Sequence, residues 1–135
     1  MSASDRPLET YDYAVIRVVP RVEREEFVNV GVILSCPTRK FLQARIELDE
    51  ARLQALDPRI DLDTVRRHLT AIETICAGGP DSGPIGQLPQ RARFHWLTAK
   101  RSSIIQTSPV HLGRCTDAGH MIEHLMTRMV RVPRD

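Results

Sequence analysis

The sequence has no long hydrophobic run, and no segment approaches the roughly 20 apolar residues that a membrane-spanning helix requires. Its first ten residues, MSASDRPLET, lack the apolar core of a signal peptide. The 3 cysteines are an odd number without CxxC spacing, which argues against a disulfide framework and predicts reduced, buried thiols. These absences predict a soluble, cytoplasmic protein.

Aromatic residues and excess charge are also scarce. Aromatics make up 4% of the chain, so aliphatic residues must fill most of the core. The net charge is only +2 and both signs are intermixed, which gives no reason to expect binding to nucleic acid or to an anionic membrane. A chain of 135 residues suffices for one domain with its own core. We expect a flexible N-terminus over residues 1–10 and a single domain over residues 11–131.

What the sequence does contain is a series of strand-like segments. Residues 11–19, 27–36 and 41–48 are rich in aliphatic and β-branched side chains, and their short connections predict an antiparallel meander. Within the second segment, Gly31 predicts a bulge or a close approach by another backbone. Strict alternation there would place one group of side chains on a single face: Val28, Val30, Val32 and Leu34. A fourth strand is expected over residues 102–111, interrupted at Pro109 and therefore at an edge.

Helical periodicity follows the first three strands. Asp49 is the expected N-cap of a short helix, and Asp61 that of a longer helix ending at Gly78. The longer helix carries one apolar stripe, made by Leu62, Val65, Leu69, Ile72 and Cys76. Residues 78–89 read as a loop. Thr116 is the expected cap of a final helix whose buried stripe contains Ala118, Ile122, Leu125 and Met129. The chain therefore predicts an α+β fold, a mainly antiparallel sheet of about four strands with helices packed on at least one face.

Three stretches are similar to a bacterial family of unknown function, DUF3037. They are residues 11–34 (YDYAVIRVVPRVEREEFVNVGVIL), 44–53 (ARIELDEARL) and 94–113 (FHWLTAKRSSIIQTSPVHLG), and the strings EFVNVGV and SPVH are distinctive. The resemblance runs from about residue 10 to residue 130 and implies no catalytic residues. Members are often encoded beside a HipA-like protein, a relative of bacterial serine/threonine kinases, which implies a HipA-like partner.

The string His120-Met121-Ile122-Glu123-His124 matches H-x-x-E-H, the inverted zinc-protease signature. Such a site needs a further acidic ligand downstream, yet no Glu occurs among the 11 residues after His124. We therefore favour an exposed histidine pair and predict no metal and no cofactor. Cys115 precedes a helix N-terminus, where a thiolate can be stabilised. A small metal- or thiol-dependent enzyme using Cys115, His120 and His124 is thus the alternative.

Residues 91–101 interleave basic and aromatic side chains, a pattern that can bind single-stranded nucleic acid weakly. The favoured interpretation is a short helix in which Phe94, Trp96 and Leu97 pack inward while the basic heads stay solvated. The glycine-rich stretch GGPDSGPIG has neither Walker nor dinucleotide-binding spacing. Nucleic-acid binding is therefore the weaker hypothesis.

A polar set on the fourth strand and its neighbours is the remaining candidate site. Its side chains can hold an anion or a peptide backbone, although a solvated strand face is the favoured explanation. The candidate binding residues are Glu26, Asn29, Arg101, Ser102, Gln106, Ser108 and His111. The leading hypothesis is a non-enzymatic protein-interaction module, accessory to a HipA-like protein and without catalytic residues.

Overall fold

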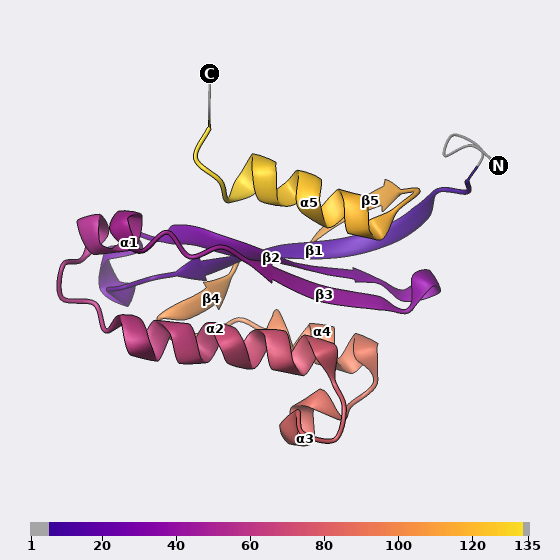
Figure 1. Ribbon diagram of the computed structural model, residues 1–135, viewed down its shortest axis with the longest axis horizontal. Helices are drawn as coiled ribbons and strands as arrows, with labels where there is room; N and C mark the ends of the chain where they lie inside the picture. The colour runs from indigo at the N-terminus through magenta and orange to yellow at the C-terminus, as the bar shows by residue number, and fades with distance from the viewer. Residues whose placement is uncertain (1–5, 134–135) are drawn as a thin grey trace.

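The computed structural model describes residues 6–133. A five-stranded antiparallel sheet carries helices on both faces, with α5 on one side and α2 and α4 on the other (Figure 1). The strands are β1 (Glu9–Val18), β2 (Val28–Cys36), β3 (Phe41–Ile46), β4 (Ile105–Thr107) and β5 (His111–Cys115). The helices are α1 (Glu50–Leu56), α2 (Leu62–Ala77), α3 (Gly83–Gly86), α4 (Gln90–Leu97) and α5 (Ala118–Met129). The predicted α+β fold class is confirmed.

The N-terminal strand begins earlier than the sequence suggested. β1 starts at Glu9, within the segment expected to be flexible, because Glu9 pairs with Cys115 of β5. Residues 1–5 of that segment lie outside the described residues. None of the helices over residues 6–133 is long and apolar enough to cross a membrane.

The long strand β1 organises the sheet. β2 pairs along one side of it, and β3 pairs with the outer side of β2. β4 and β5 both pair with the other side of β1, one after the other, with Thr107 opposite Ile16 and His111 opposite Tyr13. The predicted fourth strand is therefore an edge strand in two pieces, divided at the expected proline.

A β-bulge lies where β1 meets β2. Ile16 pairs with Gly31 whereas Arg17 pairs with Asn29, so one residue of β2 has no counterpart. A Cβ atom at Gly31 would lie only 2.5 Å from the carbonyl oxygen of Arg45 on β3. The prediction of a bulge or close approach at this glycine is confirmed in both respects.

Because of the bulge, the side chains of β2 do not all occupy the face of the sheet that the sequence predicts for them. Val28 and Val30 pack in the core beneath α2 and α4, whereas Val32 and Leu34 pack in the core beneath α5. The expectation that all four share one face was wrong, because an inserted residue reverses the alternation of every side chain that follows it. The same strand thereby contributes to both cores.

The helix caps follow from short polar side chains at the expected boundaries. Asp49 accepts a hydrogen bond from the backbone N–H of Arg52, and Asp61 accepts one from Thr64, as predicted. The final helix is capped by Asp117 rather than by Thr116. Asp117 has the extended backbone of an N-cap, and its carboxylate accepts the N–H of His120 at 3.0 Å.

In the segment before β4, two side chains differ from the sequence prediction in whether they are buried or exposed. Arg93 is buried, and its guanidinium donates to the carbonyl oxygens of Ile75 and Cys76, both at 2.9 Å, at the end of α2. It is not solvated, because these otherwise unpaired helix-end carbonyls provide it with acceptors. Trp96 is 41% exposed rather than packed inward, although Phe94 and Leu97 are buried as expected.

Candidate functional site

A groove opens beside edge strand β4, between α2 and the end of α4. Its volume is about 230 Å³. The walls are mostly apolar, with Ala71, Ile72 and Ile75 from α2, Trp96 and Leu97 from α4, and Ile105 from β4. We call this feature the β4 groove.

The position of α2 explains why the groove exists. Leu62, Val65, Leu69 and Ile72 direct the helix onto the core beneath the sheet, and α2 packs mainly along β3 rather than β4. α4 spans only eight residues and ends at Leu97. On the sheet face that α2 and α4 cover, the region beside β4 is therefore bordered by both helices, but neither helix packs into it.

The outer backbone of β4 is positioned to pair with another chain. Ser108 donates its N–H to the carbonyl of Val15 at 2.8 Å, and Ile104 accepts the N–H of Val19 at 2.7 Å. Because antiparallel strands alternate the direction of their backbone groups, Ile105 and Thr107 turn theirs outward, where the Ile105 carbonyl accepts a hydrogen bond from the exposed Ser103 hydroxyl at 2.7 Å. An edge of this kind is a template for an additional strand.

The rim of the β4 groove is aromatic and cationic. The Arg101 guanidinium carbon lies 4.2 Å from the centroid of the Trp96 ring, within cation–π range. Arg101 also donates to the Trp96 carbonyl at 2.5 Å, which holds the two side chains together. His68 joins them from α2, and the lining includes no Asp or Glu.

The candidate binding residues do not form one site. Arg101 and Gln106 line the β4 groove, and exposed Ser102 adjoins it in sequence. Glu26 lines a separate hollow with Arg21 and Arg24. Asn29 lies on the opposite face, where its amide donates to the Met129 carbonyl at 3.0 Å.

The last two candidates belong to the interrupted edge strand. Ser108 is buried, and its hydroxyl accepts the backbone N–H of Val15 at 2.8 Å. His111 is exposed and lies against Tyr13, with ring centroids 5.3 Å apart. Both residues therefore act within the strand pairing of β1 and do not reach the groove.

Sequence reasoning missed the aromatic rim and the α2 wall. A signal for the wall was present, because Ala71 and Ile75 extend the apolar stripe of α2 beyond the predicted residues. A signal for the rim was also present, because Trp96 and Arg101 belong to the basic and aromatic pattern of residues 91–101, but Trp96 was expected to pack inward. Its exposure depends on where α4 ends relative to β4, which local periodicity does not encode.

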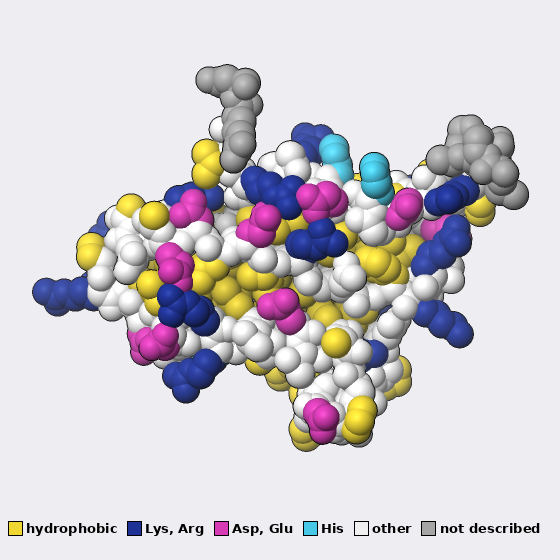
Figure 2. Space-filling view, in the orientation of Figure 1, with side chains coloured by type: hydrophobic (Ala, Val, Ile, Leu, Met, Phe, Trp, Pro, Cys, Tyr) yellow, Lys and Arg dark blue, Asp and Glu magenta, His cyan; other side chains and the backbone are white. Residues whose placement is uncertain are grey.

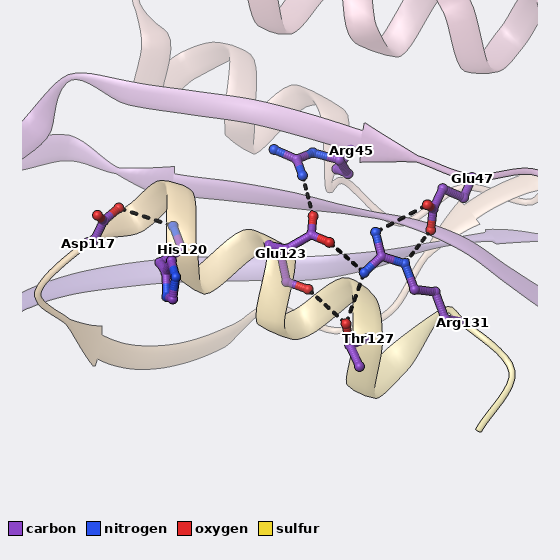
Figure 3. Close-up of polar contacts among 7 residues, drawn as sticks. All are labelled: Arg45, Glu47, Asp117, His120, Glu123, Thr127 and Arg131. Carbon is purple, nitrogen blue, oxygen red and sulfur yellow. Dashed lines mark hydrogen bonds and ion pairs between the residues drawn. The ribbon is translucent and has the colours of Figure 1, made fainter. Parts of the chain in front are cut away.

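The H-x-x-E-H string on α5 has another role. Glu123 turns toward the sheet, whereas His120 points to the other side of the helix (Figure 3). Glu123 pairs with Arg45 of β3 and with Arg131 at 2.5 Å, and Arg131 also binds Glu47 at 2.7 and 3.1 Å. The hydrogen bond from Arg131, together with the charges of both arginines, lowers the pKa of Glu123 below its ordinary value.

The surroundings of the two histidines do not make a metal site. His120 and His124 are both exposed, and Figure 2 shows histidine side chains at the outer surface over α5, above intermixed acidic and basic groups. Across residues 6–133, no three His, Cys, Asp or Glu side chains are grouped so as to hold a metal ion. The glutamate serves as an ion-pair anchor for α5.

The cysteines are buried thiols. Cys115 ends β5, and burial, assisted by neighbouring Cys36, raises its pKa, which opposes the expected thiolate. Burial raises the pKa of Cys76 to about 12. Cys36 on β2 and Cys115 on β5 flank β1 from opposite sides. The two cysteines are therefore separated by two strand spacings of roughly 4.8 Å each, which is farther than a disulfide can reach.

The basic residues of the 91–101 segment are largely engaged within the protein. Arg91 pairs with Asp12 and donates to the Ser35 hydroxyl at 3.1 Å, which attaches α4 to the sheet. Arg93 binds backbone carbonyls, and Phe94 is buried. The remaining exposed groups, Lys100 and Arg101, are too few for a continuous phosphate-binding stripe.

The fold and its groove define an α+β protein with an antiparallel sheet layered between helices and one edge beside an apolar groove. Residues 13–130 match the family described as "Protein of unknown function (DUF3037)". Because the match covers most of the chain, the protein belongs to this family. No curated protein and no solved structure matched the chain.

Proposed function

We propose that this protein is an interaction module that binds an extended segment of a partner protein alongside β4. The observation that carries the proposal is the outward backbone of Ile105 and Thr107 beside the apolar β4 groove. A strand added to this edge would form main-chain hydrogen bonds with β4. Its alternate side chains would enter the groove, since successive side chains of a strand point to opposite faces.

The size of the groove favours peptide side chains over a whole small molecule. Its volume of about 230 Å³ lies below the roughly 300–1,000 Å³ of typical small-molecule pockets. The larger hollow beside the end of α5, about 770 Å³, is lined by Arg131, which is already paired with Glu47, and by Arg52, which donates to the Val130 carbonyl. The β4 groove instead combines the outward backbone groups of an edge strand with apolar walls.

The proposed partner is a HipA-like protein, as the family resemblance implies, and the proposed location is the cytoplasm. All three cysteines are free and buried, which suits a reducing compartment. An accessory role of this kind requires a stoichiometric complex.

The test is co-expression with a HipA-like protein encoded beside the gene, followed by affinity purification and sizing. Thr107→Pro removes the outward N–H and places a ring where an added strand would lie, without removing a bond to β1. Thr107→Val keeps the N–H and serves as the matched control. We expect a stoichiometric complex with the unmodified chain and Thr107→Val, and its loss with Thr107→Pro. A complex that survives Thr107→Pro would contradict binding at this edge, and no complex at all would contradict the HipA-like partner.

A further inference from the structure

We infer that the segment accepted by β4 is acidic, with apolar side chains at alternate positions and an Asp or Glu carboxylate placed against Arg101. This inference rests on the proposed function, because it specifies the chemistry of the strand that would pair with β4.

The cation at the rim has no acidic neighbour. Several charged side chains around the sheet are paired within the protein, as Arg91 is with Asp12 and Arg131 with Glu47. Over residues 6–133, the cation–π contact and the hydrogen bond of Arg101 are both with Trp96, and no carboxylate lies in ion-pair range. Lys100 adjoins it and is exposed. This edge therefore presents positive charge that the fold itself does not neutralise.

The α2 wall adds no negative charge. His68 lines the groove, whereas Arg67, which donates to the Thr64 hydroxyl at 3.2 Å, is not among the lining residues. Glu73 is the only acid between His68 and Ile75. At about 100° per residue, it lies roughly 160° around the helix from Ala71 and Ile75. An acidic segment thus meets complementary charge at the Arg101 rim and no acidic side chain on the α2 wall.

The arrangement of Arg101 favours a carboxylate on a side chain. Its guanidinium carbon lies 4.2 Å from the centroid of the Trp96 ring, and the planar donors of a guanidinium match the geometry of a carboxylate. The apolar walls provide contacts for the neighbouring side chains of the same strand. Apolar burial would supply affinity and the carboxylate would supply selectivity.

The first experiment selects displayed random 12-residue peptides on the purified full chain, with parallel selections on Thr107→Pro and Thr107→Val. Sequencing should reveal peptides that depend on position 107, with alternating apolar residues and more Asp and Glu than the starting library. Selection on Arg101→Gln should lose the acidic enrichment and keep the apolar alternation. Arg101→Lys, which keeps the charge, should retain the acidic enrichment.

The second experiment measures the charge effect directly. Trp96 is the single tryptophan of the chain and lines the groove, so its emission reports on occupancy. Replacing Glu by Gln in a selected peptide should weaken binding about two- to fivefold, the range for an exposed ion pair, and added salt should reduce the difference.

The outcomes separate the two proposals. One contrary result would be peptides that depend on Thr107 but show no acidic enrichment, and another would be an acidic enrichment that is unchanged in Arg101→Gln. Either result would overturn the proposal of an acidic segment and leave the proposal of strand addition intact. A set in which no peptide is sensitive to Thr107→Pro would overturn both. If sizing shows that a second copy of the chain fills the edge, the partner segment is likewise overturned.

Discussion

At position 108, a serine hydroxyl replaces a backbone group in the sheet. Pro109 cannot donate to the strand pairing, and it separates β4 from β5. The Ser108 hydroxyl accepts the N–H of Val15 and donates to the Pro109 carbonyl, both at distances below 3.0 Å, so the buried N–H of β1 keeps a partner. The Ser-Pro pair thereby interrupts the edge strand without leaving the central strand unsatisfied.

Replacing Ser108 by Ala should destabilise the protein by about 1–3 kcal/mol, the cost of leaving a buried donor unpaired. Urea unfolding followed by circular dichroism would measure the change. Ser102→Ala is the matched control, since Ser102 is exposed in the segment before β4. Equal stabilities for the two variants would show that the hydroxyl does not replace the backbone bond.

At the scale of elements, helix α5 is attached to the sheet by both packing and charge. Ile122 and Met126 are fully buried against the sheet, while Glu123 and Arg131 form the ion-pair network of Figure 3. The cap at Asp117 adds a further carboxylate whose pKa is lowered by the hydrogen bond from His120. The helix therefore depends on ionised acids at its start and middle.

The pH dependence of this attachment has a definite sign. The pKa of Glu123 is lower in the folded state than its ordinary value of 4.5. Its contribution to the free energy of unfolding is therefore complete above pH 4.5 and is lost as the pH falls through the lowered pKa. We expect the melting temperature to decrease below about pH 4.5, with a shallower decrease in Glu123→Gln. Glu73→Gln, which removes an exposed helical carboxylate with no ion pair over residues 6–133, is the control and should retain the parent slope. Identical slopes for Glu123→Gln and the parent would refute the role of the network.

At the scale of the whole molecule, the sheet separates two hydrophobic cores. Ile33 belongs to the core beneath α2 and α4, and Ile122 belongs to the core beneath α5, both with 0% exposure. Strand β2 supplies residues to both cores because of its bulge. The cores therefore share a backbone but not their side-chain contacts.

Ile33→Val and Ile122→Val should each cost about 0.5–1.5 kcal/mol, and the double variant should cost their sum within roughly 0.5 kcal/mol. The reason is that side chains on opposite faces of the sheet share no cavity. Chemical denaturation of the parent, single and double variants gives the interaction energy. A large non-additive term would mean that the sheet transmits packing changes between the cores.

Much of the fold could be predicted because its signals are local. The caps at Asp49 and Asp61, the stripe of α2 and the interruption at Pro109 depend only on neighbouring residues, and the structure contains all of them. The cap of α5 was misplaced by one residue, since Thr116 and Asp117 are both suitable side chains and only the backbone conformation distinguishes them.

The candidate site was predicted only in part, for a different reason. Arg101 and Gln106 meet at the β4 groove, but Glu26 and Asn29 lie elsewhere because β1 separates β2 from β4. The exposure of Trp96 and the burial of Arg93 depend on how α4 meets α2, elements separated by a glycine- and proline-rich connection.

The sequence by itself determined the α+β class, the order of the first three strands and of the main helices, and the family, because periodicity, capping and distinctive strings are properties of neighbouring residues. The short helix α3, within residues expected to form a loop, was not predicted. Only the tertiary structure decided which face each half of β2 covers, which charges remain unpaired, and that an open edge lies beside an apolar groove. These features arise where residues distant in the chain come into contact, and such contacts depend on register and packing rather than on local pattern.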